Sequence, residues 1–185
     1  MLFRLEAADE SLMATARHRM DVSHDYAAAP ERVHRSFLAF VGNPQNPWSP
    51  GFLGVDWWTP AERLEHAVMD ELYTFMRMRV HVVEHVLGQR SVAYVSRWSL
   101  PLAVRMVQVV ELTRLSNGAS RLHYSVAYDA PRVFERMVPP VEWAFRKWFE
   151  ASLRGLDRYL RTNPEHELRE VRETREVPTT SPRRA

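Results

Sequence analysis

The chain has 185 residues, near the size of one domain, and 45% of them are hydrophobic, which suffices for one core. Its 25 basic residues nearly balance 23 acidic ones, and no basic cluster is interleaved with aromatic residues, which argues against a nucleic-acid-binding protein. The absence of cysteine excludes disulfides and thiolate metal sites, and the absence of an apolar run of about 18 residues predicts no integral membrane association and a cytoplasmic location.

The first predicted strand covers residues 20–26. Met20, Val22, His24 and Tyr26 alternate there with polar residues, which is the period of a half-buried strand. We therefore expect these four side chains on one buried face.

A short amphipathic helix is predicted for residues 30–41, because a proline suits the first helical turn and apolar residues recur at helical spacing. The three prolines and two glycines of residues 42–51 indicate a loop. Residues 52–58 are expected to form a strand or its beginning. A helix or turn is possible for residues 60–68, which begin as a capping box would.

The stretch HVVEH, residues 81–85, matches the H-x-x-E-H pattern of inverted zinc proteases. Its surroundings favour a strand, because apolar and polar residues alternate from residue 76 to residue 82. In a strand His81 and His85 share a face but lie about 13 Å apart, too far to bind one metal ion. We therefore predict no metal site and no other cofactor.

Three further strands are predicted at residues 91–100, 104–115 and 120–128, the last two joined by a turn at residues 116–118. Consecutive short strands with tight turns indicate an antiparallel sheet. From residue 140 to residue 162 the apolar residues follow helical spacing, so a long helix covers the sheet.

Four segments carry a more specific pattern, namely MDVSHDYAAAPERVHRSFLAF (20–40), NPWSPGFLGV (46–55), SNGASRLHYSVAY (116–128) and FRKWFEASLRGLDRYL (145–160). They resemble the first strand and helix, the Trp-Pro-Gly loop, the glycine turn with its strand, and the closing helix of the SRPBCC superfamily. That superfamily includes START-like lipid carriers, birch-pollen-allergen-like proteins and polyketide cyclases/dehydrases. Ser120 stands where these proteins usually have threonine, and residues 59–75 have no clear counterpart.

The resemblance implies an α+β helix-grip fold, in which a curved antiparallel sheet wraps around a long C-terminal helix and encloses a cavity. Residues 17–163 are then a START-like ligand-binding domain. Residues 1–16 are predicted to be an N-terminal extension, and residues 164–185 a flexible charged tail.

Strand alternation predicts which side chains face the cavity. Along the strand at 91–100 it points residues 92, 94, 96 and 98 inward. The resulting lining is apolar with a few polar tips, which suits a bulky, lipid-like or aromatic ligand. The predicted ligand-binding residues are His24, Tyr26, Val80, Val82, Tyr94, Ser96, Trp98, Met106, Gln108, Tyr124, Tyr128 and Trp148.

The predicted function is binding of a hydrophobic small molecule, as a carrier, sensor or accessory protein, and the sequence leaves any protein partner unknown. One alternative is a cofactor-independent polyketide cyclase/dehydratase, in which His24 acts as general base and Tyr124 and Tyr128 donate hydrogen bonds. A second alternative is a co-chaperone-like interaction module, which requires exposed apolar surface on the long helix or at residues 52–58.

Overall fold

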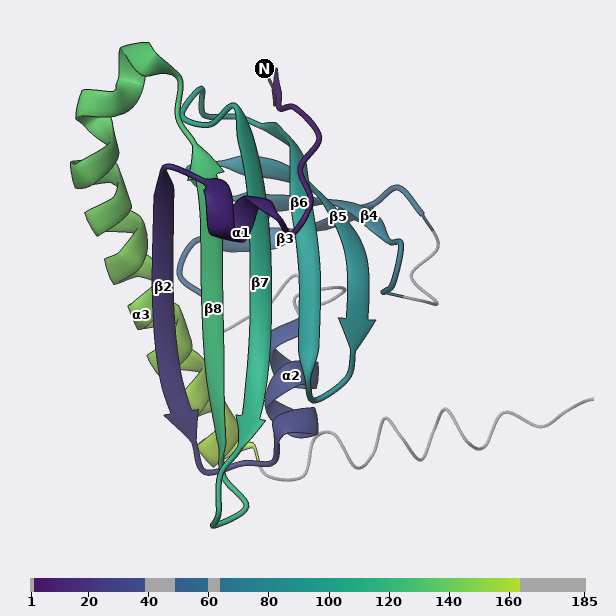
Figure 1. The fold of residues 1–185 in the computed structure, drawn as a ribbon. Helices are drawn as coiled ribbons and strands as arrows, with labels where there is room; N and C mark the ends of the chain where they lie inside the picture. The colour runs from purple at the N-terminus through teal and green to yellow at the C-terminus, as the bar shows by residue number, and fades with distance from the viewer. Residues whose placement is uncertain (1, 39–48, 60–63, 164–185) are drawn as a thin grey trace, which may run out of the picture.

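The computed structural model describes residues 2–38, 49–59 and 64–163. Its strands form one curved antiparallel sheet in the order β2-β8-β7-β6-β5-β4-β3, and β1 pairs with β6 (Figure 1). The strands are β1 (Phe3–Arg4), β2 (His18–Tyr26), β3 (Phe52–Trp57), β4 (Val68–Tyr73), β5 (Arg77–Val86), β6 (Arg90–Trp98), β7 (Arg105–Arg114) and β8 (Ser120–Asp129).

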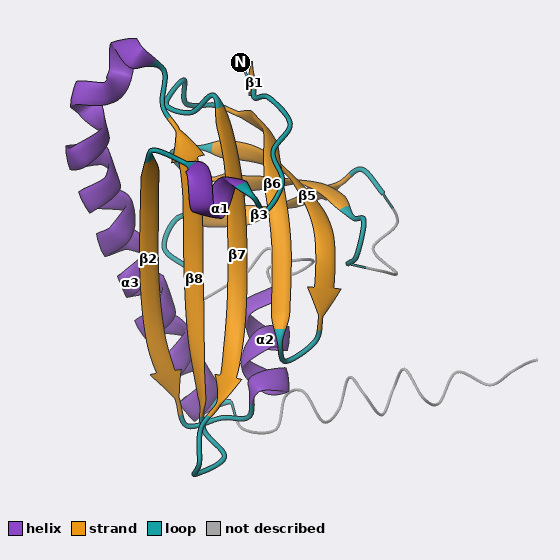
Figure 2. Ribbon diagram, in the orientation of Figure 1, coloured by secondary structure: helices purple, strands orange, loops and turns teal. Residues whose placement is uncertain are grey.

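The long helix α3 (Val138–Thr162) runs beside β2 along one side of the sheet (Figure 2). The described residues also contain α1 (Leu12–Thr15), α2 (Pro30–Leu38) and the 3-10 helix η1 (Arg132–Met137). Leu153, Leu156 and Leu160 of α3 are buried in the main core. The predicted α+β helix-grip architecture is therefore confirmed. No helix within the described ranges has the length and apolar character needed to cross a membrane.

The two faces of the sheet have separate cores. The inner face carries the main core beneath α3 and α2. On the outer face, Leu12 of α1 packs in a small cluster with Val92, Val107 and Val109. Residues 2–16, predicted to precede the domain, thus pack on it, and Leu5 is buried in the main core. The predicted charged tail at 164–185 lies outside the described residues.

Two irregularities in the pairing of β5 with β6 change which side chains face inward. The register shifts between Arg79 and Val80, and again between Val82 and Glu84. An extra residue in one strand reverses the alternation beyond it. His81 therefore lies on the outer face while His85 lies on the inner face, so the prediction that the two histidines share a face is wrong.

Strand β4 was not predicted. Residues 64–67 form a turn rather than a helix, and residues 60–63 lie outside the described part. Val68 begins β4, and its backbone N–H donates to Thr59 Oγ1 at 2.9 Å. The strand pairs with both β3 and β5, and it brings a carboxyl group, Glu71, to the inner face.

Candidate functional site

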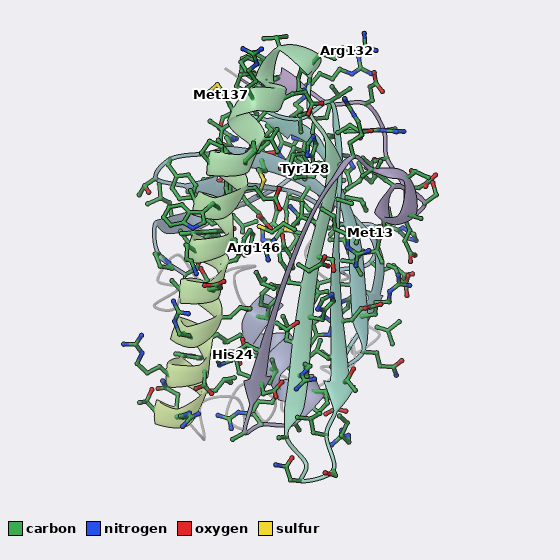
Figure 3. The ribbon with its side chains drawn as sticks, turned by 60° about the vertical axis from the view of Figure 1, so that its left-hand side comes forward. Met13, His24, Tyr128, Arg132, Met137 and Arg146 are labelled. Carbon is green, nitrogen blue, oxygen red and sulfur yellow. The ribbon has the colours of Figure 1, made fainter. Side chains whose placement is uncertain are left out.

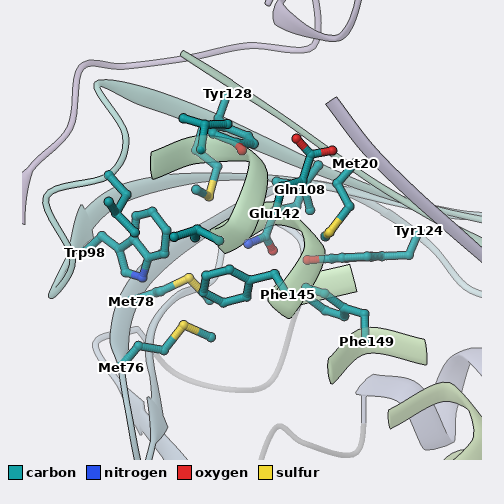
Figure 4. Close-up of a pocket in the computed structure, with 15 residues that line it drawn as sticks. Met20, Met76, Met78, Trp98, Gln108, Tyr124, Tyr128, Glu142, Phe145 and Phe149 are labelled. Atoms are coloured by element: carbon teal, nitrogen blue, oxygen red, sulfur yellow. The ribbon is translucent and has the colours of Figure 1, made fainter. Parts of the chain in front are cut away.

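A first chamber, here the methionine chamber, lies between the sheet and the N-terminal half of α3 (Figure 4). Its volume is about 50 Å³. Four methionines give it a flexible apolar wall, and the Gln108 amide and Tyr124 hydroxyl point toward its middle (Figure 4). The chamber is lined by Met20, Met76, Met78, Trp98, Leu102, Met106, Gln108, Tyr124, Val126, Tyr128, Val138, Val141, Glu142, Phe145 and Phe149.

A second chamber, here the Glu71 chamber, has a volume of about 80 Å³. Met78, Gln108, Tyr124 and Phe149 line both chambers. These shared side chains are the boundary between the two, and their rotation would join them. The rest of the second chamber is lined by Phe37, Leu64, Met69, Glu71, Tyr73, Val80, Val82, His85, Ser91, Ala93 and Val110.

Glu71 is the most unusual group in the cavity. Tyr73 donates a hydrogen bond to Glu71 Oε2 at 3.2 Å, and no lysine, arginine or histidine in the described residues forms an ion pair with the carboxyl group. Burial raises the pKa of Glu71 to about 7, although the Tyr73 hydrogen bond opposes the shift. The carboxyl group is thus poised to gain or lose a proton near neutral pH.

The two tyrosines near Glu71, Tyr73 and Tyr124, are buried. Burial, followed by the negative charge of Glu71, raises the pKa of Tyr73 and of Tyr124 well above its usual range. Both phenols therefore stay protonated. Tyr73 donates its proton to Glu71, whereas the Tyr124 hydroxyl can donate a hydrogen bond to a bound molecule.

A series of hydrogen bonds connects His34, Ser91 and His85, of which Ser91 and His85 line the Glu71 chamber. The backbone N–H of Gly88 donates to His34 Nδ1 at 2.9 Å, which places the His34 proton on Nε2. His34 Nε2 donates to Ser91 Oγ at 2.9 Å, and Ser91 Oγ donates to His85 Nδ1 at 2.8 Å. His85 is therefore a neutral imidazole with its proton on Nε2.

The pKa values support neutral histidines. Burial, together with the neighbouring His85, lowers the pKa of His34 to about 4. Burial also lowers the pKa of His85, although Glu65 opposes the shift. No signal in the sequence predicted these hydrogen bonds between His34, Ser91 and His85, because they join α2 to the strands beside the β5–β6 turn.

Seven of the predicted ligand-binding residues line the chambers. Val80 and Val82 line the Glu71 chamber, Gln108 and Tyr124 line both, and Trp98, Met106 and Tyr128 line the methionine chamber. Burial, followed by Glu142 and Glu135, raises the pKa of Tyr128 to about 12, so this phenol is also a donor.

Three predicted residues lie on the inner side of the fold but line neither chamber. His24 lies beside α3, with Nε2 3.9 Å from Asp157 Oδ2, and is well separated from Tyr128 (Figure 3). Tyr26 donates to the Leu153 carbonyl at 3.3 Å, and Trp148 Nε1 donates to the Pro50 carbonyl at 2.8 Å. Tyr26 and Trp148 have structural partners, and His24 does not meet Tyr124 and Tyr128 at one site.

Tyr94 and Ser96 lie on the outer face. The His81 ring stacks on Tyr94 with centroids 4.6 Å apart, and His81 Nε2 is 2.7 Å from Ser96 Oγ. The predicted inward orientation of both residues, and of Val92 in the outer cluster, is wrong because the β5–β6 register shift moves them across the sheet. Within the described ranges, no group of three or more His, Asp or Glu side chains is placed to hold a metal ion.

Comparison with known proteins finds similar solved structures but no match by sequence. No protein-family model and no curated protein matches the chain. A solved Chromobacterium violaceum protein is 23% identical, with a TM-score of 0.55, over 76% of this chain and 95% of that one.

Two named structures are similarly related. A START superfamily protein from Mycobacterium smegmatis is 11% identical, with a TM-score of 0.62, over 77% of this chain and 99% of that one. Ginseng major latex-like protein 151 from Panax ginseng is 12% identical, also with a TM-score of 0.62, over 77% of this chain and 96% of that one. With its curved antiparallel sheet and closing α3, the chain therefore shares the fold of these structures, which is the helix-grip fold that its sequence predicted.

Proposed function

We propose that the chain binds a hydrophobic small molecule in the two chambers beneath α3. The observation that carries this proposal is a pair of contiguous cavities whose walls are mostly methionine, aromatic and branched aliphatic side chains. Such a wall favours transfer of an apolar molecule from water. A few polar groups, including Gln108 and Glu71, are available to orient it.

The size of the chambers limits the ligand. Each chamber, and the two taken together, are smaller than the engineered cavity of about 150 Å³ that binds benzene, so a larger molecule has to join the chambers and widen them. Met78 and Phe149 separate them, and methionine changes conformation at low cost. We propose an aromatic or single-chain lipid ligand, and a carrier, sensor or accessory role in the cytoplasm.

The test is binding of 2-methylnaphthalene to the purified protein, measured by native mass spectrometry and by thermal shift. Val126→Phe places a ring in the methionine chamber and should abolish binding. Val83→Phe, which adds the same ring at an exposed residue of β5, is the control and should bind normally. Absence of binding by the wild-type protein, or equal binding by both variants, would count against the proposal.

A second candidate function is acid–base catalysis on the bound molecule, as in the predicted cyclase/dehydratase alternative. The observation that favours it is Glu71, a half-buried carboxyl group with a pKa of about 7 beside the Tyr73 hydroxyl. We propose Glu71 as the base of this second candidate in place of the predicted His24, because Glu71 lines a chamber and His24 does not.

Turnover of an aromatic polyketide precursor would test this second candidate. Glu71→Gln should abolish turnover with the fold intact, whereas His24→Ala should retain it. The opposite pattern would restore His24 as the base, and no turnover by the wild-type protein leaves binding as the function.

A further inference from the structure

The ionisable groups that line the two chambers include acidic side chains but no lysine or arginine among the described residues. They are Glu71, Tyr73, His85, Tyr124, Tyr128 and Glu142. Neither chamber has a lysine or arginine among the described residues that line it. Among the lining residues that the structure describes, the cavity therefore holds two carboxyl groups and no permanent positive charge.

The two carboxyl groups have different surroundings. Glu142 on α3 lies 3.5 Å from the Arg146 guanidinium, so its charge is partly neutralised. Glu71 accepts a hydrogen bond from Tyr73 only, among the residues that the structure describes. Any unbalanced negative charge inside the cavity is thus at Glu71.

His85 does not supply the missing positive charge. Its Nδ1 accepts the Ser91 hydroxyl proton, and burial disfavours a second proton on the ring. The group that His85 can offer is a neutral N–H on Nε2, a donor without net charge.

We propose that this cavity selects its ligand by the charge of the polar end. It admits an apolar molecule whose polar end donates a hydrogen bond to Glu71, as a hydroxyl or an ammonium group does, and it excludes carboxylates, sulfonates and phosphates. An anion beside Glu71 meets a like charge in a medium of low dielectric constant, where repulsion is strong. This inference rests on the proposed function and specifies its ligand.

The aromatic rings that line the Glu71 chamber are suited to either admitted group. Tyr73, Tyr124 and Phe149 line this chamber together with Glu71, and Tyr124 packs on Phe149 with ring centroids 4.6 Å apart. Aromatic faces attract a cation when water is excluded and pack equally well on an apolar chain. Together with the carboxylate they form a receptor for a hydrogen-bond donor.

Four probes with one carbon skeleton test the inference by isothermal titration at about pH 8, where Glu71 is mostly ionised. They are 2-methylnaphthalene, 2-naphthalenemethanol, 2-naphthylmethylamine and 2-naphthoate. The alcohol and the amine should bind at least as tightly as the hydrocarbon, and the carboxylate at least about tenfold more weakly. A preference for the amine over the alcohol, or the reverse, identifies which donor the site favours.

Two variants locate the discrimination. Glu71→Gln keeps the shape and removes the charge, so it should bind 2-naphthoate nearly as well as the alcohol. Glu142→Gln, the control, should keep the wild-type preference because Arg146 already offsets that carboxylate. Should Glu71→Gln fail to fold, the wild-type protein supplies the same test, since discrimination should weaken from about pH 8 to about pH 5.5 as Glu71 gains a proton.

Three outcomes decide between the proposals. Equal binding of 2-naphthoate and the alcohol by the wild-type protein overturns the charge selection and leaves hydrophobic binding intact. Persistent discrimination in folded Glu71→Gln also overturns it, because another group must then repel the anion. Failure of all four probes, 2-methylnaphthalene included, rejects the proposed function itself.

Discussion

Asp70 and Glu71 are adjacent on β4, yet they face opposite sides of the sheet and have opposite environments. Arg79 Nε and Arg77 Nη2 each lie 2.7 Å from an Asp70 carboxylate oxygen. Burial alone would raise the pKa of Asp70, but the hydrogen bonds from Arg79, Arg77 and Trp58 outweigh it and bring the pKa to about 2. For Glu71, no cation in the described ranges offsets the effect of burial, and the pKa is about 7.

The comparison separates a structural carboxylate from a functional one. Two arginines compensate the buried charge of Asp70, so the group stabilises the fold. Glu71 has no such compensation from the residues that the structure describes, and it faces a cavity, where its charge acts on whatever enters. A buried carboxyl group kept without a cationic partner is typical of binding and catalytic sites.

Removing the charge at Asp70 should have the largest effect on stability. Asp70→Asn leaves Arg77 and Arg79 without their buried partner, and we expect a loss of about 2–4 kcal/mol in the free energy of unfolding. Urea denaturation at neutral pH measures it. Asp56→Asn, the control, affects an exposed carboxylate 3.5 Å from Arg77 and should cost less than about 0.5 kcal/mol. Similar losses for both variants would contradict the assigned role.

Removing the charge at Glu71 should have the opposite sign. The pKa is about 7 in the folded protein and about 4.3 in an unfolded chain, so wild-type stability falls as the pH rises from about 4.3 to about 7. Glu71→Gln lacks this loss, and we expect it to be more stable than the wild type by about 1–3 kcal/mol at about pH 8 and equally stable at about pH 4. Denaturation of both proteins across this range is the measurement.

The pH dependence also has a control. Glu142→Gln removes the other cavity carboxyl group, which is ion-paired with Arg146, and should not show the gain at high pH. A Glu71→Gln protein that is less stable than the wild type at high pH would show that the carboxylate has a stabilising partner.

Breaking the histidine chain should have a smaller effect. Ser91→Ala removes the hydroxyl that joins His34 to His85, and an unsatisfied buried group costs about 1–2 kcal/mol. Thermal unfolding at neutral pH measures the change. Ser96→Ala, which removes the partner of His81 on the outer face, should cost less than Ser91→Ala. A larger loss for Ser96→Ala than for Ser91→Ala would show that the hydrogen bonds between His34, Ser91 and His85 do not stabilise the fold.

The smallest effect on stability is expected from substitution of Trp58, which lies beside Asp70 and Arg79. The Arg79 guanidinium lies 3.7 Å from the centroid of the Trp58 ring. Trp58 is 59% exposed, and Trp58→Leu should cost about 0.5–1 kcal/mol through the lost cation–π contact and the lost hydrogen bond to Asp70. Trp143→Leu, on a residue that is 64% exposed, should leave the unfolding midpoint unchanged; a loss as large as that of Trp58→Leu would contradict this account.

The boundaries of most elements could be predicted because local signals mark them. Strand alternation, the turn at residues 116–118 and the apolar face of α3 each lie within a short stretch of chain. Strand β4 was missed because apolar residues from Leu64 to Phe75 also recur at helical spacing. Pairing with β3 and β5 decides between the two structures.

The site was harder to predict than the fold. Alternation correctly placed Gln108, Tyr124 and Tyr128 in the cavity wall, because β7 and β8 pair without a register shift. It failed for Tyr94 and Ser96, where one extra residue reverses the faces. Glu71 carries no local signal, since a glutamate that follows another acidic residue, Asp70, is usually exposed to solvent.

The sequence by itself determined the periods of the strands and of the long helix, the turns between them, and with these the helix-grip order of elements. The tertiary structure alone decided which face each residue of β5 and β6 presents, and that Asp70 meets two arginines while Glu71 meets a cavity. The physical reason is that period depends on neighbours in the chain. Register and the pKa of a buried carboxyl group depend on residues that are distant in the chain and close in space.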